Sequence, residues 1–332
     1  MKKVNLCILG CGSVARLHSR VARTLKSRVN LLYASRSKEK AEEYNRKFNG
    51  AGAFGSYEAA CADPKVDAVF ICTPHARHVE HARLAVAEKK AVLIEKPIAR
   101  NLDEVSAIES AVSDAGVIAM VAENYFFKPL VTVLRHHIER GDIGKPMFLE
   151  LNRAGGNKVS DWRADAEMMG GGALLEGGIH WVNLLASIGG EVTEVVAAQP
   201  SGTHDLVAPL EDSLELLVRF ENGSVGKMLH SWNSLNRIGG LGMSKLYGTD
   251  GNIAFESNGI FALVLGKRKR LRFPGFFDIM GYRAMLAHFI ECVSDNKPPS
   301  MSLAVARRDM QIVFAAYRSL ESGAFEAVEL SR

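Results

Sequence analysis

A glutamate and a histidine lie four residues apart within an otherwise apolar stretch, LLEGGIHWVNLLAS at 174–187. The apolar residues recur at roughly helical spacing, which predicts a helix. One polar stripe on that helix would contain Glu176, His180, Asn183 and Ser187. A carboxylate and an imidazole that converge on one place are typical of a site that transfers protons.

The alternative is an ordinary amphipathic helix whose polar side faces water. An exposed helical face usually carries long charged side chains, yet no Lys or Arg occurs between Arg163 and Arg219. Gly177 and Gly178 lie in the middle of the stretch, and each costs about 1 kcal/mol relative to Ala in a helix interior. We therefore expect a ligand or another backbone to approach closely here, and we expect the stripe to face a cleft.

A glycine-rich turn near the N-terminus predicts a dinucleotide site. The segment GCGSVA matches the GxGxxA fingerprint and contains Gly10, Gly12, Ser13, Val14 and Ala15. Gly10 would permit the tight turn, and Gly12 would let a pyrophosphate approach the amides at the start of a helix. The fingerprint is weak alone, but here it follows a strand-like run and precedes a helical pattern, as the motif requires.

The residues after the second apolar run indicate which nucleotide binds. Sites that prefer NAD usually place an acidic residue there to bind the ribose 2′-hydroxyl. This chain has Ser35 and Arg36 instead, followed by Lys38 and Lys40. A guanidinium and a hydroxyl can bind a 2′-phosphate, which a carboxylate would repel. We predict NADP(H), with NAD(H) as the alternative if Arg36 stacks on the adenine of either cofactor.

A lysine with a possible catalytic role follows another apolar run. The run AVLI at 91–94 leads into Glu95, Lys96 and Pro97, and ligands of open α/β sheets bind at the carboxyl ends of the strands. Lys96 could donate a hydrogen bond to a substrate oxygen as hydride leaves the neighbouring carbon. Pro97 excludes the α region for Lys96, which helps to fix the direction of its side chain. The alternative is a surface ion pair between Glu95 and an arginine.

Three histidines, His75, His78 and His81, recur at the start of a helical pattern. Zinc ligands must converge on one point, whereas side chains at this spacing drift around the helix axis. We therefore predict no metal site.

Apolar runs and helical patterns alternate through the first part of the chain. The strand-like runs lie at 3–9, 29–34, 67–72, 91–94 and 117–122. The helical patterns lie at 13–26, 38–48, 77–88 and 102–115. This alternation predicts a parallel sheet with helices on both faces. Later strand-like runs, which predict a second and hairpin-rich sheet, lie at 214–220, 225–232 and 245–247.

The composition is that of an ordinary globular chain, with 47% hydrophobic residues, 23% charged residues and a net charge of +4. A length of 332 residues suggests about two domains. The basic cluster KRKRLR at 267–272 is more typical of a solvated strand edge than of a nucleic-acid site. We predict no nucleic-acid partner.

No apolar stretch approaches the roughly 20 residues that span a bilayer, so we predict no membrane association. The opening segment MKKVNLCILGCG has too short an apolar run for a signal peptide, and it ends in a glycine turn. The five cysteines are odd in number and form no CxxC pair, which is typical of buried thiols in a reducing compartment. We therefore expect a cytoplasmic protein.

Six motifs follow one another along the chain: GCGSVA, CTPHARH, IEKP, AENYFFKP, the pair Trp162–Arg163, and GGGALLEGGIHWVNLL. In order and spacing they resemble the family of glucose–fructose oxidoreductases and inositol dehydrogenases, Gfo/Idh/MocA, over nearly the whole chain. The resemblance implies an α/β fold whose N-terminal Rossmann domain, residues 1–122, binds the dinucleotide. It also implies a C-terminal α+β domain, residues 123–332, with a large, mostly antiparallel open sheet for substrate binding and oligomerisation.

The resemblance implies roles for individual residues. Lys96 matches the catalytic lysine of the family, and His180 matches its catalytic histidine. The residues that would contact the cofactor or its nicotinamide pocket are Lys96, Thr73, Pro74, His78, Glu95, Asn124, Trp162 and Arg163. The residues that would contact the substrate are Lys96, Glu176, His180 and Asn183. Tyr282, at the start of a closing helix, could also reach this pocket, although core packing is the alternative.

Two positions depart from the family pattern. Glu176 stands where the family usually has Asp, and Asn183 stands where Asp is common. As a third catalytic group, Glu176 can still reach a substrate hydroxyl or His180, but with shifted geometry because Glu is one methylene longer. The reaction class can still be inferred from the family. The identity of the substrate cannot, because these two residues differ.

Family members transfer hydride between NAD(H) or NADP(H) and a hydroxyl or keto carbon of a sugar, sugar derivative or cyclic polyol. The alternative is a glycosidase or lyase of the same fold that oxidises a sugar carbon transiently with retained nicotinamide. A binding protein without chemistry is disfavoured because Lys96 and His180 are both present. The open sheet face must be buried, so we expect a homodimer or homotetramer through the C-terminal sheet.

Overall fold

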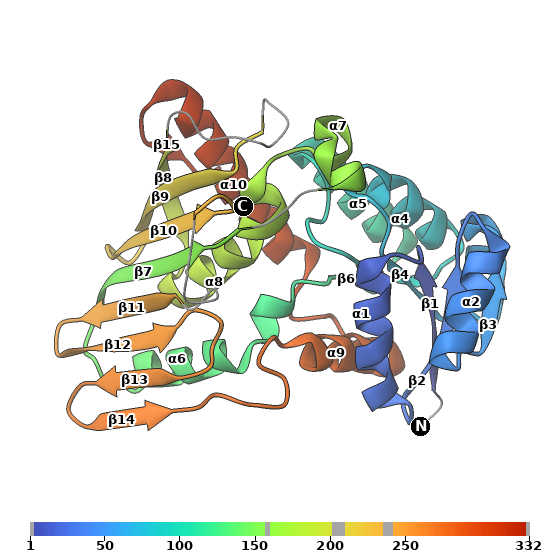
Figure 1. The fold of residues 1–332 in the computed structure, drawn as a ribbon, viewed down its shortest axis with the longest axis horizontal. Helices are drawn as coiled ribbons and strands as arrows, with labels where there is room; N and C mark the ends of the chain where they lie inside the picture. The colour runs from blue at the N-terminus through green and yellow to red at the C-terminus, as the bar shows by residue number, and fades with distance from the viewer. Residues whose placement is uncertain (1–2, 157–159, 201–209, 235–241, 330–332) are drawn as a thin grey trace. The chain divides into compact units, whose positions relative to one another are not determined.

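The computed structural model describes residues 3–156, 160–200, 210–234 and 242–329 (Figure 1). The chain divides into two compact units. Unit 1 contains Met1–Glu123 and Tyr282–Arg307, and unit 2 contains Asn124–Gly281 and Arg308–Arg332. The first boundary lies one residue from the expected one, whereas residues 282–307 belong to unit 1 and the sequence prediction places them in the second domain.

Helix α9 (Tyr282–Asp295) explains this difference. Its buried side chains include Met285, Leu286 and Phe289, which form an apolar stripe. An amphipathic helix must bury such a stripe, and α9 packs against α1 (Ser13–Ala22) and β1 (Val4–Leu9). The pattern of α9 predicts a helix with one covered face, but it does not indicate which sheet covers it.

A parallel sheet with the strand order β3-β2-β1-β4-β5-β6 forms the centre of unit 1. Its other strands are β2 (Val29–Ala34), β3 (Gly52–Phe54), β4 (Ala68–Ile71), β5 (Ala91–Ile94) and β6 (Ala119–Val121). All residues of β4 and β5 are buried. Because successive side chains of a strand point to opposite faces, both faces of this sheet are covered. The predicted α/β class and parallel sheet are confirmed.

Four of the predicted elements of unit 1 have the observed bounds, namely β2, β5, α2 (Lys38–Phe48) and α5 (Leu102–Ala115). The predicted helices at 13–26 and 77–88 are shorter in the structure, where α1 ends at Ala22 before a 3-10 turn, η1 (Arg23–Leu25), and α4 spans His78–Ala87. The prediction lacks β3 and α3 (Tyr57–Ala62). Elements this short carry too little periodicity to stand out.

Unit 2 contains a nine-stranded sheet in the described part of the chain, with the order β14-β13-β12-β11-β7-β10-β9-β8-β15. Strands β7 and β10 pair in parallel, and the other neighbours are antiparallel. The strands are β7 (Pro146–Ala154), β8 (Val192–Ala198), β9 (Ser213–Phe220), β10 (Val225–Ser231), β11 (Met243–Gly248), β12 (Gly251–Glu256), β13 (Ala262–Leu265), β14 (Lys269–Arg272) and β15 (Glu326–Ala327). This is the large, mostly antiparallel sheet that was expected.

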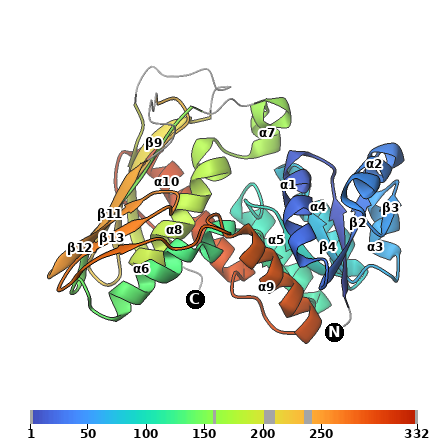
Figure 2. The same ribbon diagram turned by 60° about the horizontal axis from the view of Figure 1, so that its bottom comes forward.

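The sheet of unit 2 has one covered and one open face. Along β9, buried Leu216 and Val218 alternate with exposed Leu217 and Arg219. Helices α6 (Pro129–Glu139) and α8 (Ile179–Gly189) lie on one face of this sheet (Figure 2), and α8 packs against β7 and β10. The other face carries exposed apolar side chains, including Phe148, Leu217 and Met243.

The apolar stretch at 174–187 begins with a π-helical turn, η5 (Leu174–Gly178), and continues as α8. A π turn shifts side chains relative to a regular α-helix, so Glu176, inside η5, is displaced from the predicted stripe, whereas His180, Asn183 and Ser187 keep regular helical spacing in α8. A Cβ on Gly177 would lie 3.1 Å from Trp232 Nε1 and 3.3 Å from His230 Nε2. Close approach therefore does occur at Gly177, where the nearest neighbours are side chains of β10 and the residue after it; the expected approach of a ligand stays a prediction.

Candidate functional site

The glycine turn of unit 1 has the geometry that a pyrophosphate needs. Gly10 has φ +100°, and a Cβ at this position would lie 2.8 Å from the Cys72 carbonyl oxygen, so a larger residue would be strained. Gly12 is the extended residue before α1, and a Cβ there would meet nothing within 4 Å. Helix α1 has no capping side chain among the described residues and no acid in its first turn. Its first amides are therefore available to an anion.

The end of β2 presents a hydroxyl and a guanidinium. Ser35 is buried, and its Oγ accepts a hydrogen bond of 3.3 Å from the Ser37 backbone N–H. Arg36 is exposed. Burial raises the pKa of the nearby Tyr57 hydroxyl, and the positive charge of Arg36 opposes that rise. Ser35 and Arg36, which are predicted to bind at the ribose 2′ position, thus follow β2. The Arg36 guanidinium is open to solvent.

His78 connects the ends of two neighbouring strands. It is fully buried in α4; its Nε2 lies 3.0 Å from the Thr73 carbonyl and its Nδ1 3.0 Å from the Pro97 carbonyl. Burial lowers the pKa of His78 to about 4, so the ring is neutral near pH 7 and donates through one nitrogen. The Thr73 hydroxyl lies 2.9 Å from His81 Nδ1. Both ring nitrogens of His78 thus lie near backbone carbonyls, and its contact with the cofactor stays a prediction.

Glu95 and Lys96 follow β5, where the sequence predicts a catalytic lysine. Glu95 is buried, its Oε1 lies 2.5 Å from His18 Nε2, and its Oε2 accepts a 3.1 Å hydrogen bond from the Lys96 backbone N–H. Lys96 itself is half-buried. Glu95, for which the alternative was a surface ion pair with an arginine, is buried and contacts the buried His18. No pattern in the sequence links His18 to Glu95.

Three predicted site residues lie together in unit 2. Arg163 Nε donates to Glu176 Oε1 over 2.7 Å, and the Arg163 guanidinium lies 4.4 Å from the centre of the Trp162 ring. Glu176 is 8% exposed, so its charge is held in a largely dry environment beside a fixed cation. The carboxylate that departs from the family pattern is thus paired with the Trp162–Arg163 motif.

An aromatic ring that the sequence reasoning missed lies beside His180. Tyr125 stacks on the imidazole of His180, with ring centres 4.6 Å apart and planes 16° apart. Lys128 Nζ lies 4.0 Å from the centre of the same Tyr125 ring, and Trp181 meets that ring edge-on. Tyr125 belongs to the AENYFFKP motif, which is the signal that could have identified it.

Two predicted contact residues have partners inside unit 2. Asn183 is fully buried, and its Nδ2 donates to Asp309 Oδ2 over 2.7 Å. Asn124 donates from Nδ2 to the Met280 carbonyl over 2.6 Å, and its buried Oδ1 has no hydrogen-bond partner within the described ranges. Asn183 is thus held by a buried carboxylate of unit 2, and its contact with substrate stays a prediction, whereas Asn124 keeps an acceptor that a cofactor could use.

The histidines that suggested a metal motif serve the packing of unit 1. The rings of His75 and His78 are tilted at a centre-to-centre distance of 5.6 Å. The described residues contain no group of three or more His, Cys, Asp or Glu side chains that could hold a metal ion. No helix within the same ranges is long and apolar enough to cross a membrane.

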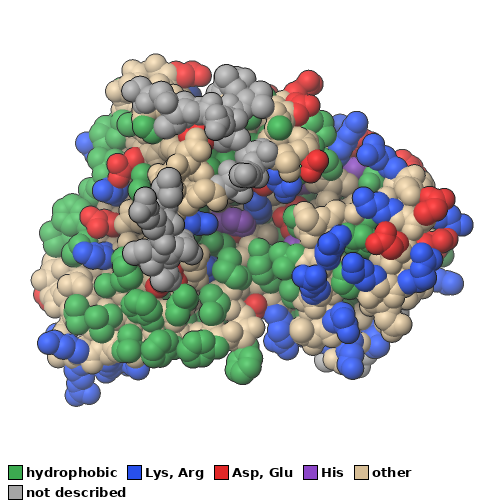
Figure 3. Space-filling model, in the orientation of Figure 1, with side chains coloured by type: hydrophobic (Ala, Val, Ile, Leu, Met, Phe, Trp, Pro, Cys, Tyr) green, Lys and Arg blue, Asp and Glu red, His purple; other side chains and the backbone are tan. Residues whose placement is uncertain are grey.

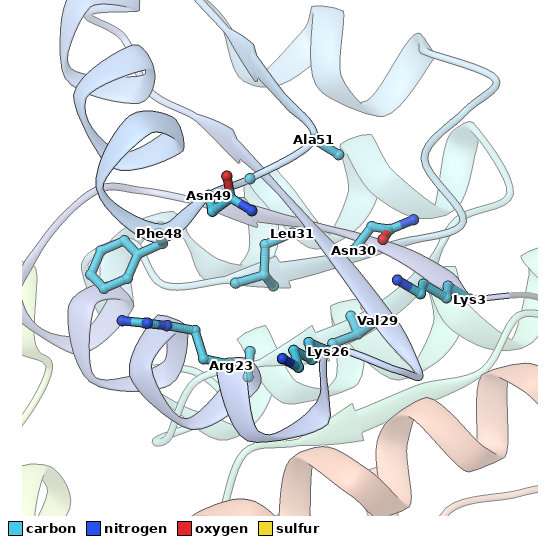
Figure 4. Close-up of a pocket in the computed structure, with 11 residues that line it drawn as sticks. Lys3, Arg23, Lys26, Val29, Asn30, Leu31, Phe48, Asn49 and Ala51 are labelled. Atoms are coloured by element: carbon cyan, nitrogen blue, oxygen red, sulfur yellow. The ribbon is translucent and has the colours of Figure 1, made fainter.

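A hollow of about 480 Å³ lies at the end of the unit 1 sheet where β1 and β2 begin (Figure 4). Its lining includes Lys3, Arg23, Lys26, Asn30 and Asn49. These residues lie near the C-terminal ends of α1 and α2 and the first residues of β1 and β2. Cations near helix C-termini compensate the negative end of the helix dipole. The hollow is therefore distinct from the dinucleotide site, which belongs at the carboxyl ends of the strands.

Two family models match the chain. Residues 4–123 match the oxidoreductase family with an NAD-binding Rossmann fold, and residues 131–254 match the GFO/IDH/MocA C-terminal domain. The chain belongs to the Gfo/Idh/MocA oxidoreductase family. This membership confirms the resemblance read from the six motifs and makes the protein an oxidoreductase with an NAD-binding Rossmann domain.

Several named relatives of this family member are dehydrogenases. Levoglucosan dehydrogenase of Pseudarthrobacter phenanthrenivorans is 27% identical over 290 residues, which are 77% of this chain and 74% of the relative. Mouse trans-1,2-dihydrobenzene-1,2-diol dehydrogenase is 30% identical over 68% of each chain. Myo-inositol 2-dehydrogenase of Thermotoga maritima is 25% identical over 95% of each chain.

Solved structures show the same fold as this Gfo/Idh/MocA member. Levoglucosan dehydrogenase in complex with NADH has a TM-score of 0.90 at 23% identity and covers 99% of this chain and 100% of its own. Aldose-aldose oxidoreductase from Caulobacter crescentus, complexed with glycerol, has a TM-score of 0.88 at 20% identity and covers 98% of this chain and 100% of its own. The two-sheet architecture is therefore that of the family.

Replacing Tyr125 with leucine is expected to lower kcat roughly 2- to 10-fold, because an aromatic pair such as Tyr125–His180 contributes about 0.5–1.5 kcal/mol beyond its buried area. Steady-state kinetics of Tyr125→Leu and Tyr125→Phe would measure this effect. The phenylalanine variant keeps the ring and should retain most of the activity. Equal losses in the two variants would contradict a stacking role and point to the Tyr125 hydroxyl.

Proposed function

We propose that this Gfo/Idh/MocA member transfers hydride between NADP(H) and a hydroxyl or keto carbon of a cyclic sugar or polyol. The observation that carries the proposal is the carboxyl edge of one parallel sheet. That edge combines an uncapped glycine turn after β1 with Lys96, which follows β5 beside a buried carboxylate. A dinucleotide and a proton-handling side chain are the two components that a dehydrogenase of this fold requires.

The bound nicotinamide supplies the hydride acceptor or donor, and residues of this chain handle the proton. In oxidation, His180 takes the proton of the substrate hydroxyl, and Lys96 holds and polarises the oxygen. In reduction, the same side chains act as donors. Glu176, paired with Arg163, binds a neighbouring substrate hydroxyl, and the Arg163 guanidinium fixes the direction of the carboxylate.

The names of the relatives support the proposed substrate class. Their names give an anhydrosugar, a cyclitol and a dihydrodiol as substrates, all of which are rings that carry neighbouring hydroxyl groups. We infer a ring with neighbouring hydroxyls for this chain as well. The paired charges of Arg163 and Glu176 favour an uncharged substrate over a sugar acid, because the guanidinium already has a carboxylate partner.

Ser35 and the exposed Arg36 support a preference for NADP(H), because together they supply a hydroxyl and a cation at the end of β2 and no carboxylate. The levoglucosan dehydrogenase structure contains NADH, so NAD(H) is the alternative cofactor. Titration of both reduced cofactors by nicotinamide fluorescence separates the two.

We further propose that unit 2 mediates a homodimer or homotetramer through the open face of its sheet. Exposed Phe148, Met243 and Leu271 belong to β7, β11 and β14, and hydrophobic side chains gather over this part of the molecule (Figure 3).

The five cysteines are free and burial raises the pKa of their thiols, which supports a reducing, cytoplasmic location.

A screen of sugars and cyclic polyols against NADP(H) and NAD(H), followed by the absorbance of the reduced nicotinamide, tests the proposed function. A dehydrogenase consumes cofactor in a one-to-one ratio with substrate. Product formation with only a trace of cofactor would instead show the transient-oxidation chemistry of a glycosidase or lyase. The dehydrogenase names of the relatives above favour the stoichiometric result.

A further inference from the structure

Four consecutive backbone amides at the start of the π turn η5, residues 172–175, are bound by two residues from distant segments. The first and the last of these amides donate to the Tyr317 hydroxyl over 3.2 and 3.3 Å. The amide of Leu174 donates to Glu211 Oε1 over 2.8 Å, and that of Ala173 donates to the Glu211 carbonyl over 2.8 Å. The first amides of a helix have no acceptor within the helix, and this pair supplies their acceptors.

Glu211 and Tyr317 also bind each other. Glu211 lies two residues before β9, Tyr317 belongs to α10 (Leu303–Ser322), and the Tyr317 hydroxyl donates to Glu211 Oε1 over 3.0 Å. Burial and the negative charge of Glu211 raise the pKa of Tyr317 well above its usual value, so the hydroxyl keeps its proton. It donates one hydrogen bond and accepts two, which is the full capacity of a hydroxyl group.

Two glycines let the backbone approach this pair. A Cβ on Gly171 would lie 2.7 Å from the Tyr317 hydroxyl oxygen, and a Cβ on Gly172 would lie 2.1 Å from the Glu211 carbonyl oxygen. Any larger residue at either position would push the backbone away from its acceptors. Both glycines belong to the GGGALLEGGIHWVNLL motif, so contact with Glu211 and Tyr317 accounts for two of its opening glycines.

The contacts of this pair reach Glu176 through Gly172. The Gly172 N–H donates to Tyr317, and the Gly172 carbonyl accepts the Glu176 N–H over 3.0 Å. Glu176 lies inside η5, and its Oε1 accepts the hydrogen bond from Arg163 Nε. A π turn contains one more residue than a regular helical turn. The place of the Glu176 carboxylate therefore depends on how the start of η5 is held.

We propose that Glu211 and Tyr317 are positioning residues for Glu176, because they hold the amides at 172–175 and thereby fix the π turn that carries its carboxylate. The inference rests on the proposed function, in which Glu176 binds a substrate hydroxyl. Without the pair, the start of η5 loosens, and the carboxylate spends less time where it binds that hydroxyl. Substrate affinity then falls, whereas the hydride transfer step is little changed.

Steady-state kinetics of three variants tests the proposal, with myo-inositol, levoglucosan or whichever ring of the screen above is turned over fastest. Tyr317→Phe removes only the hydroxyl and should raise KM for this substrate about 3- to 10-fold, while kcat and KM for NADP(H) stay within about threefold. Glu211→Asp keeps the charge but is one methylene shorter, so it should raise KM similarly. Glu211→Gln keeps the length and one acceptor oxygen, so its effect should be smaller than that of Glu211→Asp.

Amide hydrogen exchange tests the backbone at Glu176 without any substrate. In Tyr317→Phe, residues 172–176 should exchange about 3- to 10-fold faster, because amides there lose an acceptor, whereas β12 should exchange at the wild-type rate. Unchanged exchange at 172–176, or an equal acceleration in β12, would overturn the proposal. If Tyr317→Phe does not fold, Glu211→Asp replaces it in every measurement with the same expectations.

A double-variant cycle tests whether the pair acts through Glu176. Added to Glu176→Ala, Tyr317→Phe should change KM for substrate by less than about twofold, because the carboxylate that it positions is already gone. A second rise as large as in the wild-type background would overturn the proposal, as would wild-type KM in Tyr317→Phe alone. Wild-type KM in Glu176→Ala, together with faster exchange at 172–176 in Tyr317→Phe, would instead overturn the substrate contact of Glu176 in the proposed function and leave the positioning of η5 in place.

Discussion

Replacing Lys96 or His180 with alanine should reduce kcat by about 10²–10⁴-fold each, which is the usual contribution of a positioned acid or base. In the proposed reaction His180 moves the proton, and Lys96 stabilises the charge on the oxygen while hydride is transferred. Groups that act as a unit lose activity non-additively. The double variant Lys96→Ala/His180→Ala should therefore be little slower than the slower single variant.

Cofactor affinity is the control for these variants. Both alanine variants should bind NADP(H) within a few-fold of wild type, because neither residue belongs to the glycine turn or to the end of β2. Two matched changes refine the test: Lys96→Arg keeps a cation at the oxygen, and His180→Gln keeps a hydrogen-bond donor but cannot take up the proton. Near-normal kcat in His180→Ala would show that the polar residues at 174–187 serve structure and not catalysis.

The combined change Arg36→Ala/Ser35→Asp should weaken NADP(H) binding by about 2–4 kcal/mol. The loss arises because charge-assisted hydrogen bonds to the 2′-phosphate disappear and a carboxylate repels it. NAD(H), which has no 2′-phosphate, should be much less affected. Equilibrium titration of each cofactor by fluorescence measures both affinities.

Lys38→Ala is a control for general loss of positive charge, because Lys38 is exposed on the first turn of α2, close to Arg36 in sequence. Its effect on NADP(H) should be smaller than that of the combined change, since a screened surface charge contributes about 1 kcal/mol or less. Tighter binding of NAD(H) than of NADP(H) by the wild-type protein would show that Arg36 does not select the cofactor.

The elements of unit 1 could be predicted from sequence because its buried strands are continuous apolar runs bounded by turns. The runs at 29–34 and 91–94 have the observed bounds of β2 and β5, and the helices at 38–48 and 102–115 carry capping residues, Ser37 and Asn101, at their starts. Such signals are local, so they can be recognised in the sequence without knowledge of the fold.

The parts that could not be predicted depend on contacts between distant positions. His18 belongs to α1 and Glu95 follows β5, so the two meet only through the tertiary fold, and neither residue belongs to a pattern that includes the other. The partner of Glu176 is Arg163 from a separate segment. The π turn at 174–178 could not be predicted from the spacing of apolar residues either, because a π turn differs from an α-helix by a single inserted residue. Local periodicity predicts elements, whereas these pairings arise from tertiary packing.

The return of α9 to the first unit also has a consequence during protein synthesis. The strands of unit 1 are complete at residue 121, but α9 begins at Tyr282, so the ribosome translates about 160 further residues before α9 exists, which takes roughly 10–30 s. During that interval, the side of α1 and β1 that α9 later covers is exposed on the nascent chain. A fragment ending at Glu123 would keep this surface bare permanently, so we expect it to need a chaperone or to aggregate where the full-length chain does not.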